Sequence, residues 1–129
     1  MLSWLVSVFR SFGPALAGLW WAFKNQRNLQ AHAISTVLVV VFGLGLKIVI
    51  WEWCAVVLAM GLVWVAELLN TALEMLADRV TLEREESIRR VKDAAAAAVL
   101  MAALAALGVG LVVFAPKLWR LLENVPPPP

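Results

Sequence analysis

The sequence predicts an all-α integral membrane protein with three transmembrane helices and an N-terminal amphipathic helix at the membrane interface. Two observations lead to this prediction. Of the 129 residues, 63% are hydrophobic and only 16% are charged, whereas soluble domains average about 45–50% apolar and about 25% charged residues. So small a soluble fold could not bury this excess, and disorder requires low hydrophobicity and high charge. The second observation is that the apolar residues fall into three long runs.

These runs cover residues 31–50, 53–77 and 94–115, within a single membrane domain of residues 1–129. A helix needs about 20 residues to cross about 30 Å of hydrocarbon, and all three runs are long enough. Lipid offers backbone groups no hydrogen-bond partners, and the runs are too long for barrel strands, so each is expected to be a helix. Residues 78–93 are expected to form a charged cytoplasmic loop that contains a short polar helix.

Residues 1–29 are expected to form an amphipathic region that lies on the membrane surface. Large apolar side chains recur at helical spacing along its first 24 residues, but Gly13-Pro14 interrupts the pattern and predicts two short helical pieces. At the other end of the chain, residues 124–129 are expected to form a loose, Pro-rich tail.

The distribution of lysine and arginine predicts the orientation. Eight of the eleven basic residues precede the first run or lie between the second and third runs. The other three are Lys47, Lys117 and Arg120. The positive-inside rule therefore places the N-terminus and the charged loop in the cytoplasm and the C-terminus outside. The net charge of +2, without a basic patch interleaved with aromatic residues, gives no indication of nucleic-acid binding.

The second run carries polar residues that its membrane location makes informative. Four of them are spaced three, four and four residues apart, along one stripe of a helix: Glu67, Asn70, Glu74 and Asp78. A charge at the bilayer centre costs about 2.5–3.5 kcal/mol on insertion scales, so such acids indicate pairing, metal binding or function. One alternative is that the stripe only holds helices together, with Arg27 or Lys92 as partners.

The depths of these acids separate their expected roles. Asp78 is expected at the cytoplasmic surface, Glu74 one turn deeper, and Glu67 about 10 Å deeper than Glu74. Oxygen ligands at graded depth suit a reaction between a soluble and a lipid substrate, and carboxylates with an amide can hold Mg²⁺ against phosphates. Lys92 is suited to neutralising phosphate, and Asp93 is suited to capping the helix that begins at Ala94.

The pattern Ala66-Glu67-Leu68-Leu69-Asn70-Thr71-Ala72-Leu73-Glu74 is followed by Asp78, and then by Lys92-Asp93 before an alanine-rich run. In this order and spacing, the chain resembles the small prokaryotic diacylglycerol kinase family, which includes the undecaprenol kinases. Upstream, Arg27-Asn28 with His32 resembles the undecaprenol kinase branch. The resemblance extends over roughly residues 8–115.

This resemblance implies a homotrimeric helical bundle in the bacterial inner membrane. It implies transfer of the γ-phosphate of MgATP to the hydroxyl of a lipid alcohol, undecaprenol or diacylglycerol, at the cytoplasmic face. Glu67 would then be the catalytic base, and Mg²⁺ would be bound by Glu74 and Gln26. The residues expected to bind ATP or phosphate are Lys92, Asp93, Asp78, Asn70 and Arg27.

The chain also departs from the family pattern. Gln26 stands where the family commonly has a metal-binding Glu, which removes a negative charge and should weaken metal binding. Gln30 replaces a family Arg, and the loop reads Thr81-Leu82-Glu83-Arg84-Glu85 in place of Ser-Pro-Glu-Tyr-His, which bears on nucleotide contacts. Gln26 leaves open a catalytically weak or silent membrane homologue. A small ion or proton transporter that uses Glu67 is the other alternative, although it leaves the shallower polar residues unexplained.

Overall fold

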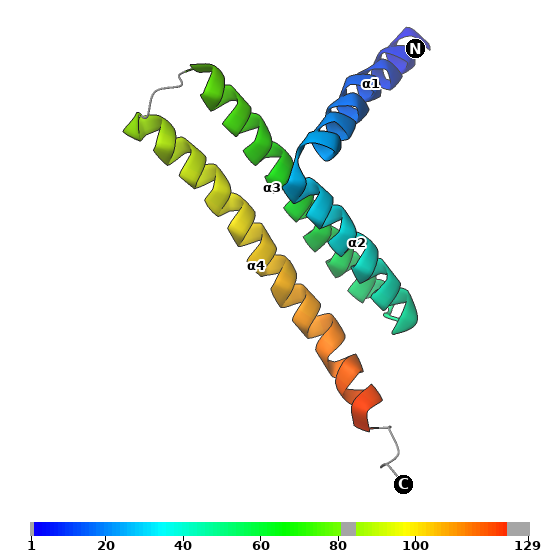
Figure 1. Cartoon of the computed structure of the whole chain (residues 1–129). Coiled ribbons are helices and arrows are strands. Elements are labelled where there is room, and N and C mark those ends of the chain that lie inside the picture. Colours follow the sequence, from blue (N-terminus) through cyan, green and yellow to red (C-terminus); the bar gives the residue numbers. More distant parts are fainter. Residues whose placement is uncertain (1, 81–84, 124–129) are drawn as a thin grey trace.

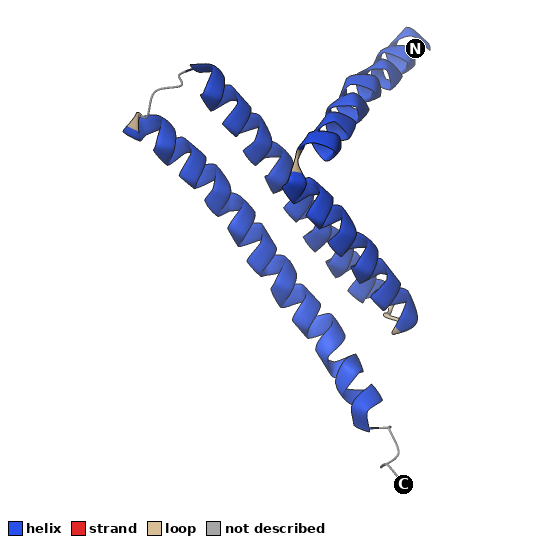
Figure 2. Ribbon diagram, viewed as in Figure 1, coloured by secondary structure: helices blue, strands red, loops and turns tan. Residues whose placement is uncertain are grey.

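The computed structural model describes residues 2–80 and 85–123, and for residues 2–9 and 11 it describes the backbone alone. These residues form four helices and no strand: α1 (Leu2–Asn25), α2 (Arg27–Gly45), α3 (Ile50–Val80) and α4 (Glu86–Glu123) (Figures 1 and 2). The last three are each long and apolar enough to cross a membrane. The predicted all-α fold with three helices of membrane-spanning length is therefore confirmed.

The helices are arranged around α3 (Figure 1). α4 runs antiparallel to α3 along most of its length, α2 packs against α3, and α1 turns away from α2 at Gln26. A small apolar core forms near the turn between α2 and α3, where Ile48, Val56 and Val113 are buried. Most large apolar side chains outside this core are exposed, as expected of surfaces that face lipid rather than water.

α1 is one continuous helix, so the prediction of two pieces separated at Gly13-Pro14 is wrong. Proline removes one N–H donor and crowds the carbonyl four residues earlier, but local backbone adjustment can accommodate it within a helix. Pro14 is exposed and lies between the small residues Gly13 and Ala15, so little crowds its ring. The chain breaks instead at Gln26, whose backbone is extended (φ −111°, ψ 114°).

Helix α2 begins at Arg27, four residues before the expected apolar run, and the segment 78–93 is less of a loop than expected. α3 continues to Val80 and α4 already begins at Glu86; residues 81–84 lie outside the described part, as does the expected tail at 124–129. Charges spaced three and four residues apart stabilise the first turns of α4. Arg89 Nη2 lies 2.8 Å and Arg90 Nε 3.1 Å from Glu86 Oε1. Hydrogen bonds from Arg89 and then Arg90 hold the pKa of Glu86 below its usual range.

A Schellman motif ends α2. The amide of Ile48 donates to the carbonyl of Gly43 (3.1 Å), and the amide of Lys47 donates to that of Leu44 (3.2 Å). This motif requires one residue in the left-handed backbone conformation, and Lys47 adopts that conformation with φ 50°. A Cβ on Gly43 would come within 2.8 Å of Cη2 of Trp53. The absence of a side chain at Gly43 therefore allows the first turn of α3 to pack closely against α2.

Two ion pairs join α3 to α4 near opposite ends of their contact. Lys117 Nζ lies 3.0 Å from Glu52 Oε2, and Lys92 pairs with Asp78. Along α3, Glu52 and Asp78 are separated by the same number of residues, within one, as their partners Lys117 and Lys92 are along α4. The two helices therefore keep one antiparallel register from one ion pair to the other. At 1.5 Å per residue the pairs are about 38 Å apart, a little more than the thickness of the hydrocarbon core.

Candidate active site

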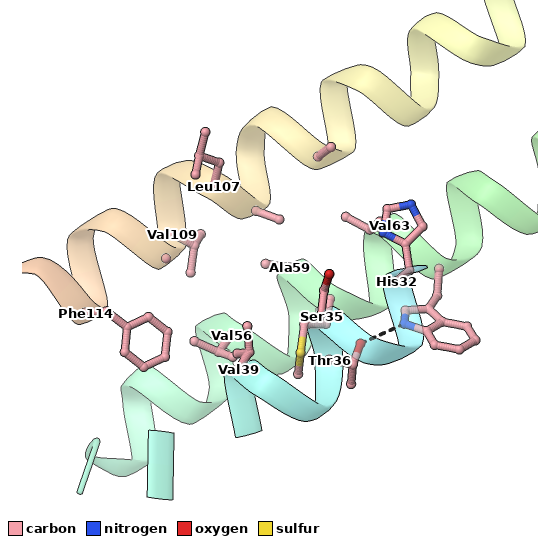
Figure 3. Close-up of a pocket in the computed structure, with 15 residues that line it drawn as sticks. His32, Ser35, Thr36, Val39, Val56, Ala59, Val63, Leu107, Val109 and Phe114 are labelled. Atoms are coloured by element: carbon pink, nitrogen blue, oxygen red, sulfur yellow. Dashed lines mark hydrogen bonds between the residues drawn. The ribbon is translucent and has the colours of Figure 1, made fainter. Parts of the chain in front are cut away.

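The register of α2 against α3 places the break between α1 and α2 beside the acidic stripe. Trp64 Nε1 donates to Thr36 Oγ1 at 3.1 Å (Figure 3), and Trp53 lies against Gly43, so these two contacts set the register of the antiparallel helices to within about one turn. With this register, Gln26 lies level with the part of α3 from Asn70 to Glu74. Gln26 and Glu74, both expected to bind metal, therefore lie within about one turn of the same level.

Glu67 is buried in the middle of α3, with 2% of its surface exposed. Within the described part of the chain, its carboxylate has no ion pair or hydrogen bond, although its oxygens are not fully enclosed. A buried carboxylate is costly unless it is paired or neutralised. Glu67 is therefore the strongest sign on α3 of a group kept for chemistry rather than for packing.

Asn70 and Glu74 form the next part of the site, one and two turns closer to Asp78. Asn70 Nδ2 donates to Glu74 Oε1 at 3.1 Å. This bond orients the amide, and it leaves Asn70 Oδ1 buried without a partner in the described structure. A buried acceptor without a donor costs about 1–3 kcal/mol, and a bound cation or a donor group of a ligand would remove that cost.

Asp78 and Lys92 meet at the end of the stripe, where α3 leaves the apolar region and α4 approaches it. The interpretation of Asp93 as a helix cap is wrong, because α4 has already begun at Glu86 and Asp93 lies within it. Asp93 pairs instead with Arg89, whose Nη1 lies 3.0 Å from Asp93 Oδ2. Because both side chains are exposed, this pair contributes little to stability and leaves Asp93 open to a ligand.

Gln26 and Arg27 lie at the hinge between α1 and α2. Gln26 is the N-cap of α2, but its side chain makes no capping hydrogen bond. Arg27 is exposed and has no ion-pair partner in the described ranges 2–80 and 85–123. Gln30 Nε2 donates to the carbonyl of Phe23 at 3.1 Å, so the glutamine that replaces a family Arg closes the end of α1. The hinge is thus held by Gln30, and both Gln26 and Arg27 remain available to a ligand.

The donor set suits Mg²⁺ bound together with phosphates. Among the described residues, no three His, Cys, Asp or Glu side chains gather as a metal cluster. Mg²⁺ needs no such cluster, because it is usually held by one or two carboxylates plus substrate phosphates and water. The Glu74 carboxylate and Asn70 Oδ1, which has no partner in the described structure, supply oxygens of the right kind, and Gln26 offers an amide oxygen at nearly the same level.

The ion pair Glu52–Lys117 is the main structural contact that the sequence reasoning missed. Glu52 also accepts a hydrogen bond from the amide of Val49 (2.7 Å), the residue before α3, which is half of a capping box. A glutamate three residues after the N-cap position was a usable signal for the cap. Nothing local indicated that Lys117 would be its partner.

Comparison with known proteins places the chain among lipid kinases. The family model for prokaryotic diacylglycerol kinase matches residues 13–114. The undecaprenol kinase of Bacillus subtilis is 37% identical over 110 residues, which cover 85% of this chain and 89% of that protein. A diacylglycerol kinase of Synechocystis is 37% identical over 113 residues, covering 87% of this chain and 65% of that protein. The diacylglycerol kinase of Escherichia coli K12 is 29% identical over 99 residues, covering 77% of this chain and 81% of that protein.

Proposed function

Because this chain belongs to the prokaryotic diacylglycerol kinase family, and is thus a lipid kinase of a bacterial membrane, we propose that it phosphorylates a lipid alcohol with MgATP. The acceptor is undecaprenol or diacylglycerol, the lipids named in its relatives. The observation that carries the proposal is Glu67, which is buried and has no partner among the described residues, followed along the same stripe by Asn70, Glu74 and the Asp78–Lys92 pair.

Glu67 acts as the base in this proposal. The lipid hydroxyl gives its proton to the Glu67 carboxylate as its oxygen forms a bond to the γ-phosphorus. The bond from that phosphorus to the oxygen of the β-phosphate breaks, and ADP leaves with that oxygen. At about 16 Å from Asp78 along α3, Glu67 lies deep enough to meet a hydroxyl carried by a lipid. The absence of an ion-pair partner in the described structure supports this role, since a paired carboxylate would be a weaker base.

Lys92 is the main phosphate ligand in the proposal. Its ammonium has three donors, so the contact with Asp78 leaves donors for phosphate oxygens. Asp78, Asp93 and Arg27 line the nucleotide site, and Asn70 positions Glu74. As in other phosphoryl transfers, the protein contributes chiefly by positioning and charge neutralisation.

Glu74 and Gln26 would hold Mg²⁺, with Asn70 Oδ1 as a further oxygen on the same stripe of α3 as Glu74. When bound, the ion neutralises charge on the transferred phosphate. The amide at Gln26 contributes an oxygen without a charge, so this chain should bind Mg²⁺ more weakly than a relative with Glu there.

The orientation and assembly follow from the same proposal. The N-terminus and the Asp78–Lys92 pair lie on the cytoplasmic side, and the C-terminus lies outside. α1 lies at the interface, where Lys24 Nζ sits 4.9 Å from the centre of the Trp20 ring, a pairing that suits the headgroup region. Three copies form the functional unit, packed through small residues of α4 such as Ala94 and Ala97, which are exposed in the single chain.

Purified protein in detergent, given radiolabelled ATP, Mg²⁺ and either lipid alcohol, tests the function directly. We expect transfer of phosphate to the lipid, and a loss of about 10³-fold or more in kcat for Glu67→Gln and for Glu74→Gln. Leu68→Gln serves as the control, because it adds the same amide on α3 beside Glu67. If Glu67→Gln and Glu74→Gln match the parent, the assignment of the site is wrong, and if the parent transfers no phosphate, the function is wrong.

A further inference from the structure

A cavity of about 370 Å³ lies between α2, α3 and α4 (Figure 3). On α3 its lining ends at Trp64, just before Glu67, so the cavity extends from the site toward the Glu52–Lys117 end. Its volume falls within the range of about 300–1,000 Å³ that is typical of ligand pockets. The lining is mostly apolar and includes Val39, Val56, Val63, Leu107, Val109 and Phe114.

The wall that α3 contributes to this cavity continues directly into the proposed base. Val56, Met60 and Val63 are spaced four and three residues apart, and Glu67 follows four residues later, so all four share one stripe of α3. Glu67 therefore lies about 6 Å beyond the last α3 wall position on this stripe. A substrate whose hydroxyl reached Glu67 would have the cavity directly behind it.

The polar groups of the cavity lie at the end nearest to Glu67. Trp64 and Thr36 hydrogen-bond to each other, and Ser35 Oγ donates to the carbonyl of Ala31 at 3.0 Å. His32 lies one turn before Thr36, on the side toward Glu67, and its ring lines the cavity (Figure 3). The cavity is thus polar beside the proposed base and apolar farther away, like a lipid alcohol.

The shape of the cavity suits one hydrocarbon chain. On α4 its lining extends from Ala103 to Phe114, about 16 Å at 1.5 Å per residue, so its modest volume is drawn out along the helix. α2 and α4 both pack against α3 rather than mainly against each other, so the cavity is reached sideways, between the two helices. A chain would enter from that side, within the bilayer.

We propose that this cavity binds the hydrocarbon chain next to the hydroxyl of a single-chain, polyprenol-type alcohol. The proposal rests on the proposed function, and it adds that the cavity selects the acceptor by the number and length of its chains. A two-chained alcohol can place only one chain there, and its second chain must stay outside the cavity beside its opening, which a single-chained alcohol avoids.

A matched pair of glycines in α4 allows a test. Gly110 lines the cavity and Gly108 does not, yet at both positions an added Cβ would meet no atom within 4 Å. Purified Gly110→Leu and Gly108→Leu are compared with the parent, using undecaprenol, the short prenol geraniol and diacylglycerol as acceptors. In Gly110→Leu the ratio of kcat/KM for undecaprenol to that for geraniol should fall about tenfold, because leucine occupies the space of the long chain. In Gly108→Leu the ratio should stay at the parent value.

Direct binding separates the cavity from catalysis. Radiolabelled undecaprenol should bind to Gly110→Leu about tenfold more weakly than to Gly108→Leu, and diacylglycerol should compete less well than undecaprenol for the parent. If Gly110→Leu does not accumulate, Gly110→Ala should show the same change at about two- to threefold. Equal ratios in the two variants, or loss of trimers only in Gly110→Leu, would overturn the proposal. A parent that phosphorylates none of the three alcohols would instead refute the proposed function.

Discussion

The two ends of the α3–α4 pair carry the same kind of contact in different surroundings. At one end, the Glu52 and Lys117 side chains are only 26% and 22% exposed, and Glu52 also accepts a hydrogen bond from Val49. At the other end, Asp78 and Lys92 are 59% and 35% exposed, close to where α3 ends at Val80 and α4 begins at Glu86. Glu52 is held by two partners within the protein. Asp78 and Lys92 are more exposed, so a ligand can replace their contact with each other. The same two helices thus have one end with a shielded ion pair and one end with an exposed pair, where the proposed nucleotide site lies.

Removing the lysine at the Asp78 end should have the largest effect on this contrast. Lys92→Met should lower kcat/KM about 100-fold, because a positioned cationic donor to phosphate is lost. It should lower the free energy of unfolding by less than about 1 kcal/mol, since exposed ion pairs contribute little. Activity and thermal unfolding would be measured in one detergent. Near-parental activity would show that Lys92 does not contact phosphate.

The matching change at the other end should have the opposite outcome. Lys117→Met should lower the free energy of unfolding by about 1–2 kcal/mol, because the partly shielded Glu52 loses its charged partner. Activity per folded molecule should stay within about twofold of the parent. Adding Glu52→Gln to Lys117→Met tests the coupling, because the double variant should lose less than the sum of the two single variants. A purely additive loss would mean that the pair contributes nothing.

A third change concerns the end with the exposed ion pair. Gln26→Glu places a second carboxylate within about one turn of the level of Glu74. The Mg²⁺ concentration for half-maximal activity should therefore fall several-fold, which corresponds to about 1 kcal/mol of additional binding free energy. Asn28→Asp adds the same charge two residues away and is the control. The measurement is a Mg²⁺ titration at saturating ATP. Equal effects of the two variants would remove Gln26 from the metal site.

The smallest effect concerns the turn that leads into the end with the shielded ion pair. Lys47 holds a left-handed backbone conformation at the close of α2, which glycine adopts without strain. Lys47→Gly should therefore raise the free energy of unfolding by about 0.5–1 kcal/mol without changing activity. Lys47→Ala keeps the strain while removing the charge, so it should not be more stable than the parent. Thermal unfolding of both variants checks this.

The long apolar runs were sufficient to predict three helices of membrane-spanning length, because length and hydropathy alone decide which segments can cross a bilayer. The break in the N-terminal region was misplaced. Pro14 is the stronger local signal for a helix break, yet α1 continues through it. The chain breaks instead at Gln26, where Gln30 donates a hydrogen bond to the carbonyl of Phe23 near the end of α1. A side chain that reaches back across a hinge depends on how the two helices meet, which no local pattern encodes.

The acidic stripe on α3 could be predicted from the sequence, because residues spaced three and four apart lie on one face of a helix whatever the tertiary structure is. The pairing of Asp78 with Lys92 fits the alternative in which Lys92 partners an acid, and sequence alone could not choose between that role and phosphate binding. The pairing of Glu52 with Lys117 and the cavity beside His32 depend on the offset between helices. That offset is set by packing over the whole length of α3, so these features emerged only from the structure.

The spacing of the two ion pairs also bears on the thickness of the membrane that suits this chain. They are about 38 Å apart along the helices, so a bilayer whose hydrocarbon core is much thinner would have to thicken locally, or the helices would have to tilt. Tilting would shift Glu67 relative to the headgroups, and with it the depth at which a lipid hydroxyl is met. Turnover should therefore depend on the acyl-chain length of the host lipid, with an optimum at matching thickness, even when the acceptor and ATP are held constant.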